Sequence, residues 1–254
     1  MRTLFLDCSS GVSGDMLLAA LSHALDECRG DKTGFSHLDK ELRSLGLRGF
    51  NLEWSIKSIS GITTHHVDVV QTEDQPLRHY TDIKGIIEAS GLGERAMERS
   101  TRALRLLGEA EAKVHGTSLD HVHFHEIGAV DTIVDICGTM LLLDALEVES
   151  TTCSPVDLGS GFVECAHGRM PVPAPACAEL AKGLTTFGSD CSMERATPTG
   201  LAILRTIADD FGPLPLGVVK SVGYGSGGRS SDEQPTFVRA LLLDKADPGE
   251  PEPE

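Results

Sequence analysis

The chain has 254 residues, an apolar fraction of 40%, and 22 Lys and Arg against 38 Asp and Glu, for a formal charge of −16. This length and apolar fraction can fill the core of one large domain or two small ones, so disorder is not expected. A surface this negative repels phosphate backbones and anionic membranes and concentrates cations, which argues against a nucleic-acid partner. Solubility alone would explain the charge equally well.

The seven cysteines are odd in number, widely spaced and without a Cys-x-x-Cys pair. This pattern indicates neither a disulfide framework nor a zinc knuckle, and it favours a reducing compartment. The apolar run at the start is too short for a signal peptide, and no window approaches the roughly 18 apolar residues of a membrane span. We therefore expect a cytoplasmic protein with no membrane partner.

The first half predicts strands and then helices. Residues 3–6 read as an apolar strand, followed by a turn and a helix with leucines at helical spacing, and residues 50–71 alternate as a strand pair around Gly61. A helix opens near Thr81 with Thr as its cap, and a longer one ends at Gly116. From Val130 to Leu141 apolar residues recur at i, i+3, i+4, i+7 and i+11, which predicts an amphipathic helix.

The second half begins with an extended proline-rich segment. Pro171, Pro173 and Pro175 precede a helix, and Thr197 and Pro198 suit the cap and first position of another. Residues 214–245 read as two strands joined by a glycine-rich loop. We expect one α/β or α+β domain over 1–243, a mixed sheet packed by helices, and a disordered acidic, proline-rich tail over 244–254. The strand order does not follow from the sequence.

The stretch "HVHFHEIGAVDTIVD" concentrates potential metal ligands. If residues 121–125 are extended, alternate side chains share one face, and imidazoles there would converge on one cation such as nickel, zinc, copper or iron. Acids follow at once, two of them four residues apart on a helical flank beside the apolar stripe. The candidate metal ligands are His121, His123, His125, Glu126, Asp131 and Asp135. The alternative is a polar strand edge followed by a solvated helix face.

The turn "LDCSSGVSGD" is a second candidate site. Asp7 ends a strand, Gly11 and Gly14 permit a tight turn, and Asp15 opens a helix whose N-terminal amides could face an anion while the acids hold a divalent ion. The turn matches neither Walker A nor Gly-x-Gly-x-x-Gly. An ordinary strand-to-helix turn with Asp15 at the positive helix end explains it equally well.

Two further segments offer backbone amides to phosphate. "ATPTG" contains Thr197 and Thr199, and "GYGSGGR" contains Gly225, Gly227 and the planar cation of Arg229. A helix start and a hairpin loop are the simpler interpretations. His167, beside glycine and proline, could be a ligand, a base or a structural donor.

Five segments in order resemble the N-terminal domain of the LarC family, the nickel insertion proteins of nickel-pincer cofactor biosynthesis. They are "LDCSSGVSGDMLLAAL", "VHFHEIGAVDTIVDICG", "GSGFVECAHGRMPVPAPA", "ERATPTGLAIL" and "GYGSGGR", and the likeness runs from residue 3 to about 243. The resemblance implies a CTP-dependent cyclometallase of the lyase class. Such an enzyme places Ni(II) into pyridinium-3,5-bisthiocarboxylic acid mononucleotide, so that two sulfurs and a ring carbon bond the metal.

A ring proton must leave in that reaction, which requires a base near the metal, and His125 and Asp131 are the candidates. The chain departs from the family twice. The tract before the helix near Thr81 has only His65, His66 and His79 instead of many histidines, and the C-terminal domain that would bind CTP with Mg(II) or Mn(II) does not follow. That domain would be a partner polypeptide or a longer frame, and a homo-oligomer is also possible.

Two other functions remain open at this point. In a divalent-metal nucleotide phosphohydrolase, Asp7 and Asp15 would hold magnesium. A non-catalytic nickel chaperone would only deliver the metal to a partner.

Overall fold

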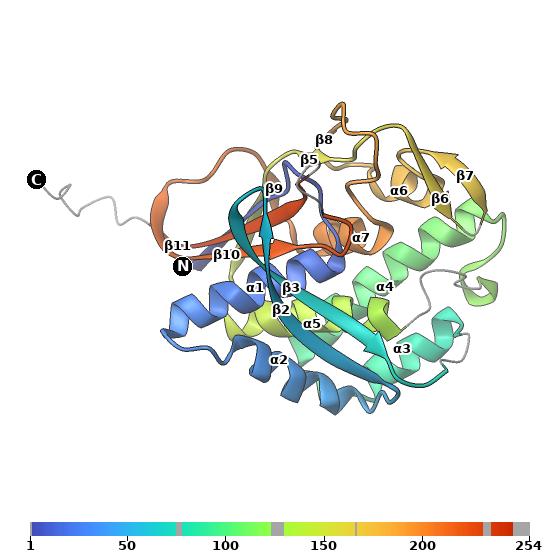
Figure 1. The fold of residues 1–254 in the computed structure, drawn as a ribbon. Coiled ribbons are helices and arrows are strands. Elements are labelled where there is room, and N and C mark those ends of the chain that lie inside the picture. The colour runs from blue at the N-terminus through green and yellow to red at the C-terminus, as the bar shows by residue number, and fades with distance from the viewer. Residues whose placement is uncertain (1, 75–77, 123–129, 166, 231–234, 246–254) are drawn as a thin grey trace, which may run out of the picture.

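The structure is a computed structural model that describes residues 2–74, 78–122, 130–165, 167–230 and 235–245. The helices in this part of the chain are α1 (Gly14–Arg29), α2 (Gly34–Leu42), α3 (Tyr80–Glu88), α4 (Glu94–Val114), α5 (Val130–Ala145), α6 (Pro175–Leu180) and α7 (Pro198–Ile207), with short 3-10 turns at Arg43–Leu45 and Leu119–His121. The strands are β1 (Arg2–Asp7), β2 (Phe50–Ile59), β3 (Ile62–Gln71), β4 (Ser150–Cys153), β5 (Val156–Asp157), β6 (Phe162–Cys165), β7 (Gly168–Pro171), β8 (Thr186–Phe187), β9 (Asp210–Phe211), β10 (Gly217–Ser226) and β11 (Phe237–Lys245). Figure 1 shows their arrangement.

The main sheet is mixed and has the order β2-β3-β10-β11-β1-β4-β9. β1 runs parallel to β4 and antiparallel to β11, and β11 also pairs antiparallel with β10. The β2–β3 hairpin joins β10 through a single residue pair, Gly225 with His65, so it attaches only at the end of that strand. The predicted mixed sheet with packed helices is confirmed.

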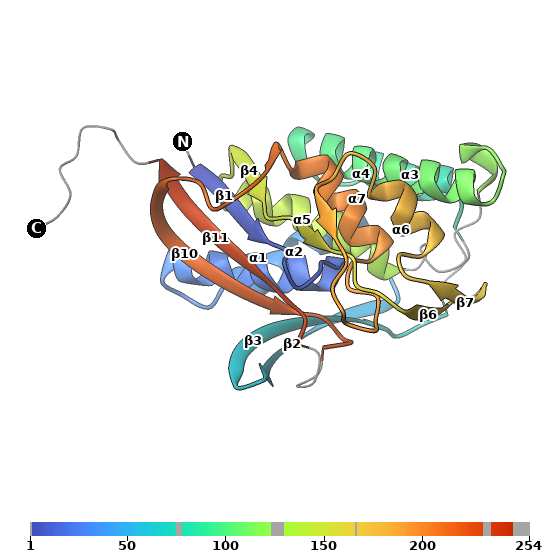
Figure 2. The same cartoon turned by 90° about the horizontal axis from the view of Figure 1, so that it is seen from above.

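Helix α1 packs on one face of the sheet against β10 and β11, as Figures 1 and 2 show. Val238, Ala240 and Leu242 of β11 are buried, while Arg239 between them is exposed. Two glycines of β10 let the strand approach the helix backbone, because a Cβ on Gly223 would lie 1.8 Å from the Ala20 carbonyl oxygen and one on Gly225 would lie 2.0 Å from that of Met16. The prediction that Gly225 lies in an exposed anion-binding loop is therefore wrong, since this glycine is a buried packing position.

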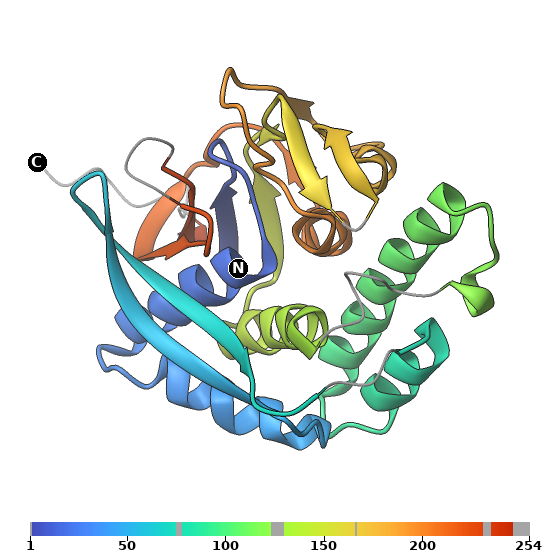
Figure 3. The ribbon, with the colours of Figure 1, turned by 45° about the vertical axis from the view of Figure 1, so that its right-hand side comes forward.

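The remaining helices form a second layer beside α1. α5 lies against α1, α2, α4 and α7, and α3 packs on α4. Figure 3 shows the β2–β3 hairpin crossing one side of this layer and the β6–β7 hairpin standing near the C-terminal end of α4. None of the helices in the described ranges is both long and apolar enough to cross a membrane.

Most elements predicted from periodicity are present, but some bounds differ and several short elements were not predicted. Helix α3 begins one residue before Thr81, and its cap is His79, whose backbone N–H donates to the Asp82 carboxylate at 2.8 Å. α2 and the inner strand β4 were not predicted. β11 continues through Asp244 and Lys245, two residues past the expected domain end, and the rest of the expected tail lies outside the described residues.

Candidate functional site

A cavity of about 360 Å³ opens at the edge of the sheet where β1 and β10 end and β11 begins. Ligand sites of open α/β sheets commonly form at the carboxyl ends of strands, where loops meet helix N-termini. The cavity brings together eight of the predicted site residues, which are Gly14, Asp15, Asp131, Asp135, Thr197, Thr199, Gly227 and Arg229.

Three helix N-termini converge on this cavity. α1 contributes Gly14 and Asp15, α5 contributes Asp131 and Thr132, and α7 contributes Thr199 beside its Thr197 cap. Each N-terminus carries a partial positive charge, which favours an anionic group placed directly beside it. α1 and α5 each place an acid in the first turn, whereas α7 has none. The positive end of α7 is thus not countered by a carboxylate of its own helix.

Asp15 joins α1 to the glycine loop after β10. Its Oδ1 accepts hydrogen bonds from the Ser13 hydroxyl and, at 2.8 Å, from the Met16 N–H. Its Oδ2 accepts from the Gly228 N–H at 3.0 Å. Asp15 is therefore committed to positioning the loop at the cavity wall.

Asp131 and Asp135 are held differently. Burial raises the pKa of Asp135 well above its ordinary value, and repulsion from Asp15 and Asp131 adds to the effect. Its Oδ1 is closed off from solvent and has no hydrogen-bond partner among the residues that the structure describes. Burial also raises the pKa of Asp131, against hydrogen bonds from Thr132. Both neighbouring carboxyls are thus harder to ionise than an ordinary aspartate. A cation bound between them would lower their pKa values again.

Gly14 is the packing counterpart of Asp135. A Cβ at position 14 would lie 2.2 Å from the Asp135 Oδ2 atom, so only glycine lets α1 and α5 approach with this carboxyl between them. The sequence turn "SGD" is therefore explained by the packing of two helices. The same packing brings Asp15 and Asp135 to one cavity.

The far wall consists of Met193, Glu194 and Arg195, just before α7. Arg195 is nearly buried, its Nε lies 3.3 Å from Asp157 Oδ2, and its Nη1 donates to the carbonyls of Ser10 and Pro235 at 3.2 and 2.9 Å. It therefore ties the β1 loop to the approach to β11. Arg229 pairs with Glu194 at 3.3 Å and is mostly exposed.

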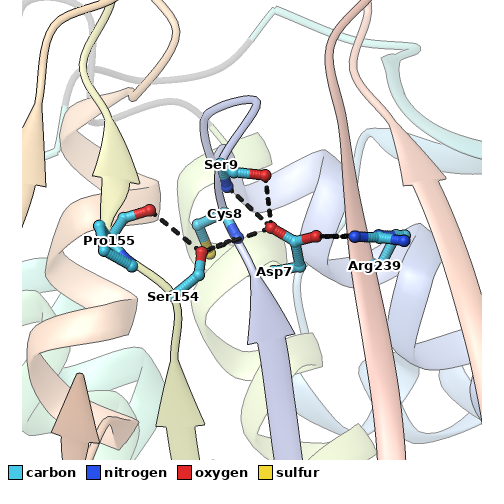
Figure 4. A network of polar contacts seen from close by, with 6 residues as sticks. All are labelled: Asp7, Cys8, Ser9, Ser154, Pro155 and Arg239. Atoms are coloured by element: carbon cyan, nitrogen blue, oxygen red, sulfur yellow. Dashed lines mark hydrogen bonds and ion pairs between the residues drawn. The ribbon is translucent and has the colours of Figure 1, made fainter. Parts of the chain in front are cut away.

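Asp7 does not line the cavity. Its carboxylate accepts hydrogen bonds from the Ser9 N–H and hydroxyl and pairs with Arg239, as Figure 4 shows. Burial opposes ionisation, but the bonds from Ser9 and Arg239 outweigh it and lower the pKa of Asp7. Gly11 is also outside the cavity: its φ is +97°, and a Cβ would meet the Arg195 carbonyl oxygen at 2.2 Å.

The predicted row of alternating ligands is only partly visible. His121 ends a 3-10 turn and is exposed, and its Nδ1 lies 2.8 Å from the Ser118 hydroxyl. His123, His125 and Glu126 lie outside the described residues. Within the ranges that are described, no three His, Cys, Asp or Glu side chains are grouped closely enough to hold a metal ion. An extended strand from residue 121 is not found, because His121 itself belongs to the turn.

A second cavity of about 380 Å³ adjoins the first, and both are lined by Glu194, Pro198 and Arg229. It contains His167, which the sequence left open as a ligand, a base or a structural donor. Here His167 faces His115 at the end of α4 instead, with 3.2 Å between their Nε2 atoms. His167 is thus next to the main cavity but not in its wall.

Several lining residues were not predicted. They include Glu194 and Arg195 in the main cavity and Glu111, His115 and Cys165 in the second. Glu194 and Arg195 stand directly before the capped start of α7, and His115 directly before Gly116, where α4 has ended. Polar residues flanking a predicted helix end were therefore the signal that could have found them.

Comparisons with known proteins identify the family of this chain. The sequence profile of the family described as nickel insertion protein matches residues 4–253. The chain is 43% identical over 249 residues to a putative nickel insertion protein of Geotalea daltonii, covering 97% of this chain and 62% of the relative. It is 45% identical over 243 residues to one of Citrifermentans bemidjiense, covering 95% and 61%.

A relative from Geobacillus kaustophilus, named pyridinium-3,5-bisthiocarboxylic acid mononucleotide nickel insertion protein, is 36% identical over 252 residues, covering 95% of this chain and 60% of the relative. The chain thus spans about three fifths of the length of these curated relatives. No solved structure matches it. A profile match over nearly the whole chain and identities of this size establish that the chain belongs to the nickel insertion protein family.

Proposed function

We propose that this chain takes part in inserting Ni(II) into pyridinium-3,5-bisthiocarboxylic acid mononucleotide, and that the main cavity receives the precursor. The observation that carries the proposal is the pair Asp131 and Asp135, two carboxyls with raised pKa in a cavity formed by three helix N-termini. Family membership supplies the metal, since carboxylates alone do not select nickel.

The cavity offers separate places for the two ends of such a precursor. The N-terminus of α7, with Thr199 and without an acid of its own, suits the phosphate. The loop at Gly227 and Gly228 closes the same side, with Arg229 next to it. The carboxyls of α5 lie at the cavity mouth and inside it, where a cation would gain most from them.

In the proposed reaction a ring C–H bond breaks and a carbon–nickel bond forms, so one proton must leave. Asp131 is the described candidate to accept it, because it is more exposed than Asp135 and its raised pKa makes it a better base than an ordinary carboxylate. His125, the other candidate from the sequence, lies outside the described residues. We place the enzyme in the lyase class on the family resemblance.

CTP, with Mg(II) or Mn(II), does not fit the main cavity. The lining carboxylates are Asp15, Asp131, Asp135 and Glu194, and the lining arginines, Arg195 and Arg229, are both in ion pairs. A triphosphate would meet more negative than available positive charge there. We therefore assign nucleotide binding to the part of the relatives beyond this chain and derive no step from it.

The phosphohydrolase alternative loses its basis, because it required Asp7 and Asp15 to share a magnesium ion. Asp7 pairs with Arg239 and does not line the cavity that contains Asp15. The nickel chaperone alternative becomes an outcome of the test below.

The test is an insertion assay with Ni(II), precursor, CTP and Mg(II), in which the nickel-bearing product is measured by mass spectrometry. It is run with this chain alone and with the remaining part of a relative added. Asp131→Asn should lower turnover by about 10²-fold or more, as expected for loss of a general base. Asp120→Asn, an exposed acid away from both cavities, is the control and should leave turnover unchanged. Stoichiometric nickel release without CTP dependence would instead indicate a chaperone.

A further inference from the structure

The second cavity contains a pair of histidines from distant parts of the chain. His115 follows the last residue of α4, and His167 stands between β6 and β7, 52 residues away. Their Nε2 atoms are 3.2 Å apart, and the rings meet edge to face at 84°. At this distance one Nε2–H can donate to the other Nε2 atom, or both nitrogens can face a shared ligand.

The spacing of the two nitrogens matches that of two ligands on one metal ion. Imidazole nitrogens bind at about 2.0–2.1 Å, so two of them at a tetrahedral angle lie roughly 3.3 Å apart. Glu111 reinforces the place, because its Oε2 atom lies 3.4 Å from the same Nε2 atom of His115. A carboxylate beside two facing imidazoles adds negative charge, which stabilises a bound cation. A neutral histidine pair without a cation has no need of that charge.

The second cavity has room for a metal ion that binds and is later released. The cavity of about 380 Å³ exceeds what one ion and its water need, and it also exposes Cys165 and Met170, two soft sulfur groups. Within the described part of the chain no three His, Cys, Asp or Glu side chains form a complete group, so there the pair supplies two ligands. Few protein ligands favour exchange, whereas structural metal sites are closed by four protein ligands.

The cavity also adjoins the proposed insertion site. Glu194 forms part of both linings, its side chain is nearly buried, and it pairs with Arg229, which lines both cavities as well. The cavity with the histidines and the cavity with the carboxyls of α5 therefore share part of their walls. No other pair of facing histidine nitrogens in the described ranges lies beside that site.

We propose that His115 and His167 form a loading site for Ni(II), separate from the insertion site, which holds the ion through two imidazoles before it passes to the adjoining cavity. The choice of nickel as the ion rests on the proposed function. The existence of a two-histidine site for a divalent transition metal rests on the geometry alone.

The experiment measures binding of Ni(II) alone to the whole chain, without precursor or nucleotide, by equilibrium dialysis and calorimetry. The chain is compared with His115→Ala, His167→Ala and the double variant. His37→Ala on α2 is the matched control, because this histidine lies in neither cavity. We expect the control to bind like the original chain and each single variant to bind one equivalent at least about 10-fold more weakly. Loss of one ligand breaks the chelate, so the double variant should be little worse than either single variant.

Unchanged stoichiometry and affinity in the double variant would overturn the proposal and leave the pair as a hydrogen bond only. Independent, additive losses would also overturn it, because two ligands of one ion must be coupled. Both residues lie at the surface, with the His115 side chain 27% exposed, so the variants should fold, and His167→Gln keeps a polar side chain there as a second check. X-ray absorption at the nickel edge should show imidazole scattering that the double variant loses.

Failure here is distinguishable from failure of the proposed function. The binding measurement contains no precursor, so a negative result would leave insertion at Asp131 and Asp135 intact. In the insertion assay the double variant should need a higher nickel concentration for half-maximal rate while keeping the maximal rate. Asp131→Asn should show the opposite pattern.

Discussion

Two pairs of aspartates lie at the same end of the sheet, one pair with cationic partners and the other without them. Asp7 and Asp157 are buried but compensated, the first by Ser9 and Arg239 and the second by Arg195. Asp131 and Asp135 are half-exposed or partly buried without a described cationic partner, and their pKa values are raised, whereas the pKa of Asp7 is lowered. Compensated acids stabilise the fold, whereas uncompensated ones remain available to a cationic ligand that would favour their ionised form.

The largest effect that tests this comparison is expected at Arg195. Arg195→Ala leaves the carboxylate of Asp157 buried without its cation, which should lower the free energy of unfolding by about 3–5 kcal/mol. Urea denaturation measures the loss. Arg105→Ala is the control, because both Arg105 and its partner Glu109 are exposed on α4, and it should cost less than about 1 kcal/mol. A small effect at Arg195 would mean that the Gly159 and Ser189 amides, which also donate to Asp157, suffice.

Asp7 gives the pH dependence of a compensated acid. Asp7→Asn weakens the bonds from Ser9 and Arg239 and should cost about 1–3 kcal/mol near neutral pH. Because the pKa of Asp7 is lowered in the fold, its contribution is complete above the ordinary aspartate pKa of about 3.9 and is lost as the pH falls through the lowered value. The stabilities of the original chain and the variant should therefore converge in acid. A difference that stays constant with pH would contradict the ion pair.

Asp135 should show the reverse, with a smaller effect. Asp135→Asn removes an acid whose ionisation the fold opposes, so it should stabilise the metal-free protein by about 1–2 kcal/mol at neutral pH. Its raised pKa means that the folded state keeps a proton that the unfolded state has released. Stability of the original chain should thus fall as the pH rises from about 4 toward that raised pKa, and the variant should lack this fall.

Urea unfolding between pH 4 and 8 in metal-free buffer checks this prediction. Asp131→Asn is the comparison and should stabilise less, because Asp131 is more exposed. Destabilisation by Asp135→Asn at neutral pH would mean that the carboxylate has a partner and belongs with Asp7.

Local patterns predicted the elements well where they were long and periodic. The helix from Val130 and the Thr197 cap are present, the latter accepting from the Gly200 N–H at 3.2 Å. β4 could not be read in the same way, because its four residues "STTC" are too short for a periodic signal and owe their strand to pairing with β1.

The sequence predicted the acidic residues of the site, but it did not predict which residues the fold brings together. Asp131 and Asp135 follow from a helical flank beside an apolar stripe, and Asp15 from a helix start. That Asp7 turns away to Arg239 depends on the register of β1 with β11, which pairs residues 232 positions apart. His115 and His167 likewise meet only through the tertiary fold, since neither has a ligand-like neighbour pattern of its own.

The close contact between β10 and α1 has a consequence for anyone who scans this chain by mutagenesis. Gly223 and Gly225 leave no room for even a methyl group against the helix backbone, whereas a Cβ on Gly228 meets nothing within 4 Å. A mutational scan would therefore find the two buried glycines as intolerant of substitution as residues that contact a substrate. Their intolerance would report the spacing of a strand and a helix, and a Gly-x-Gly signature in such a scan should not be taken for a phosphate loop.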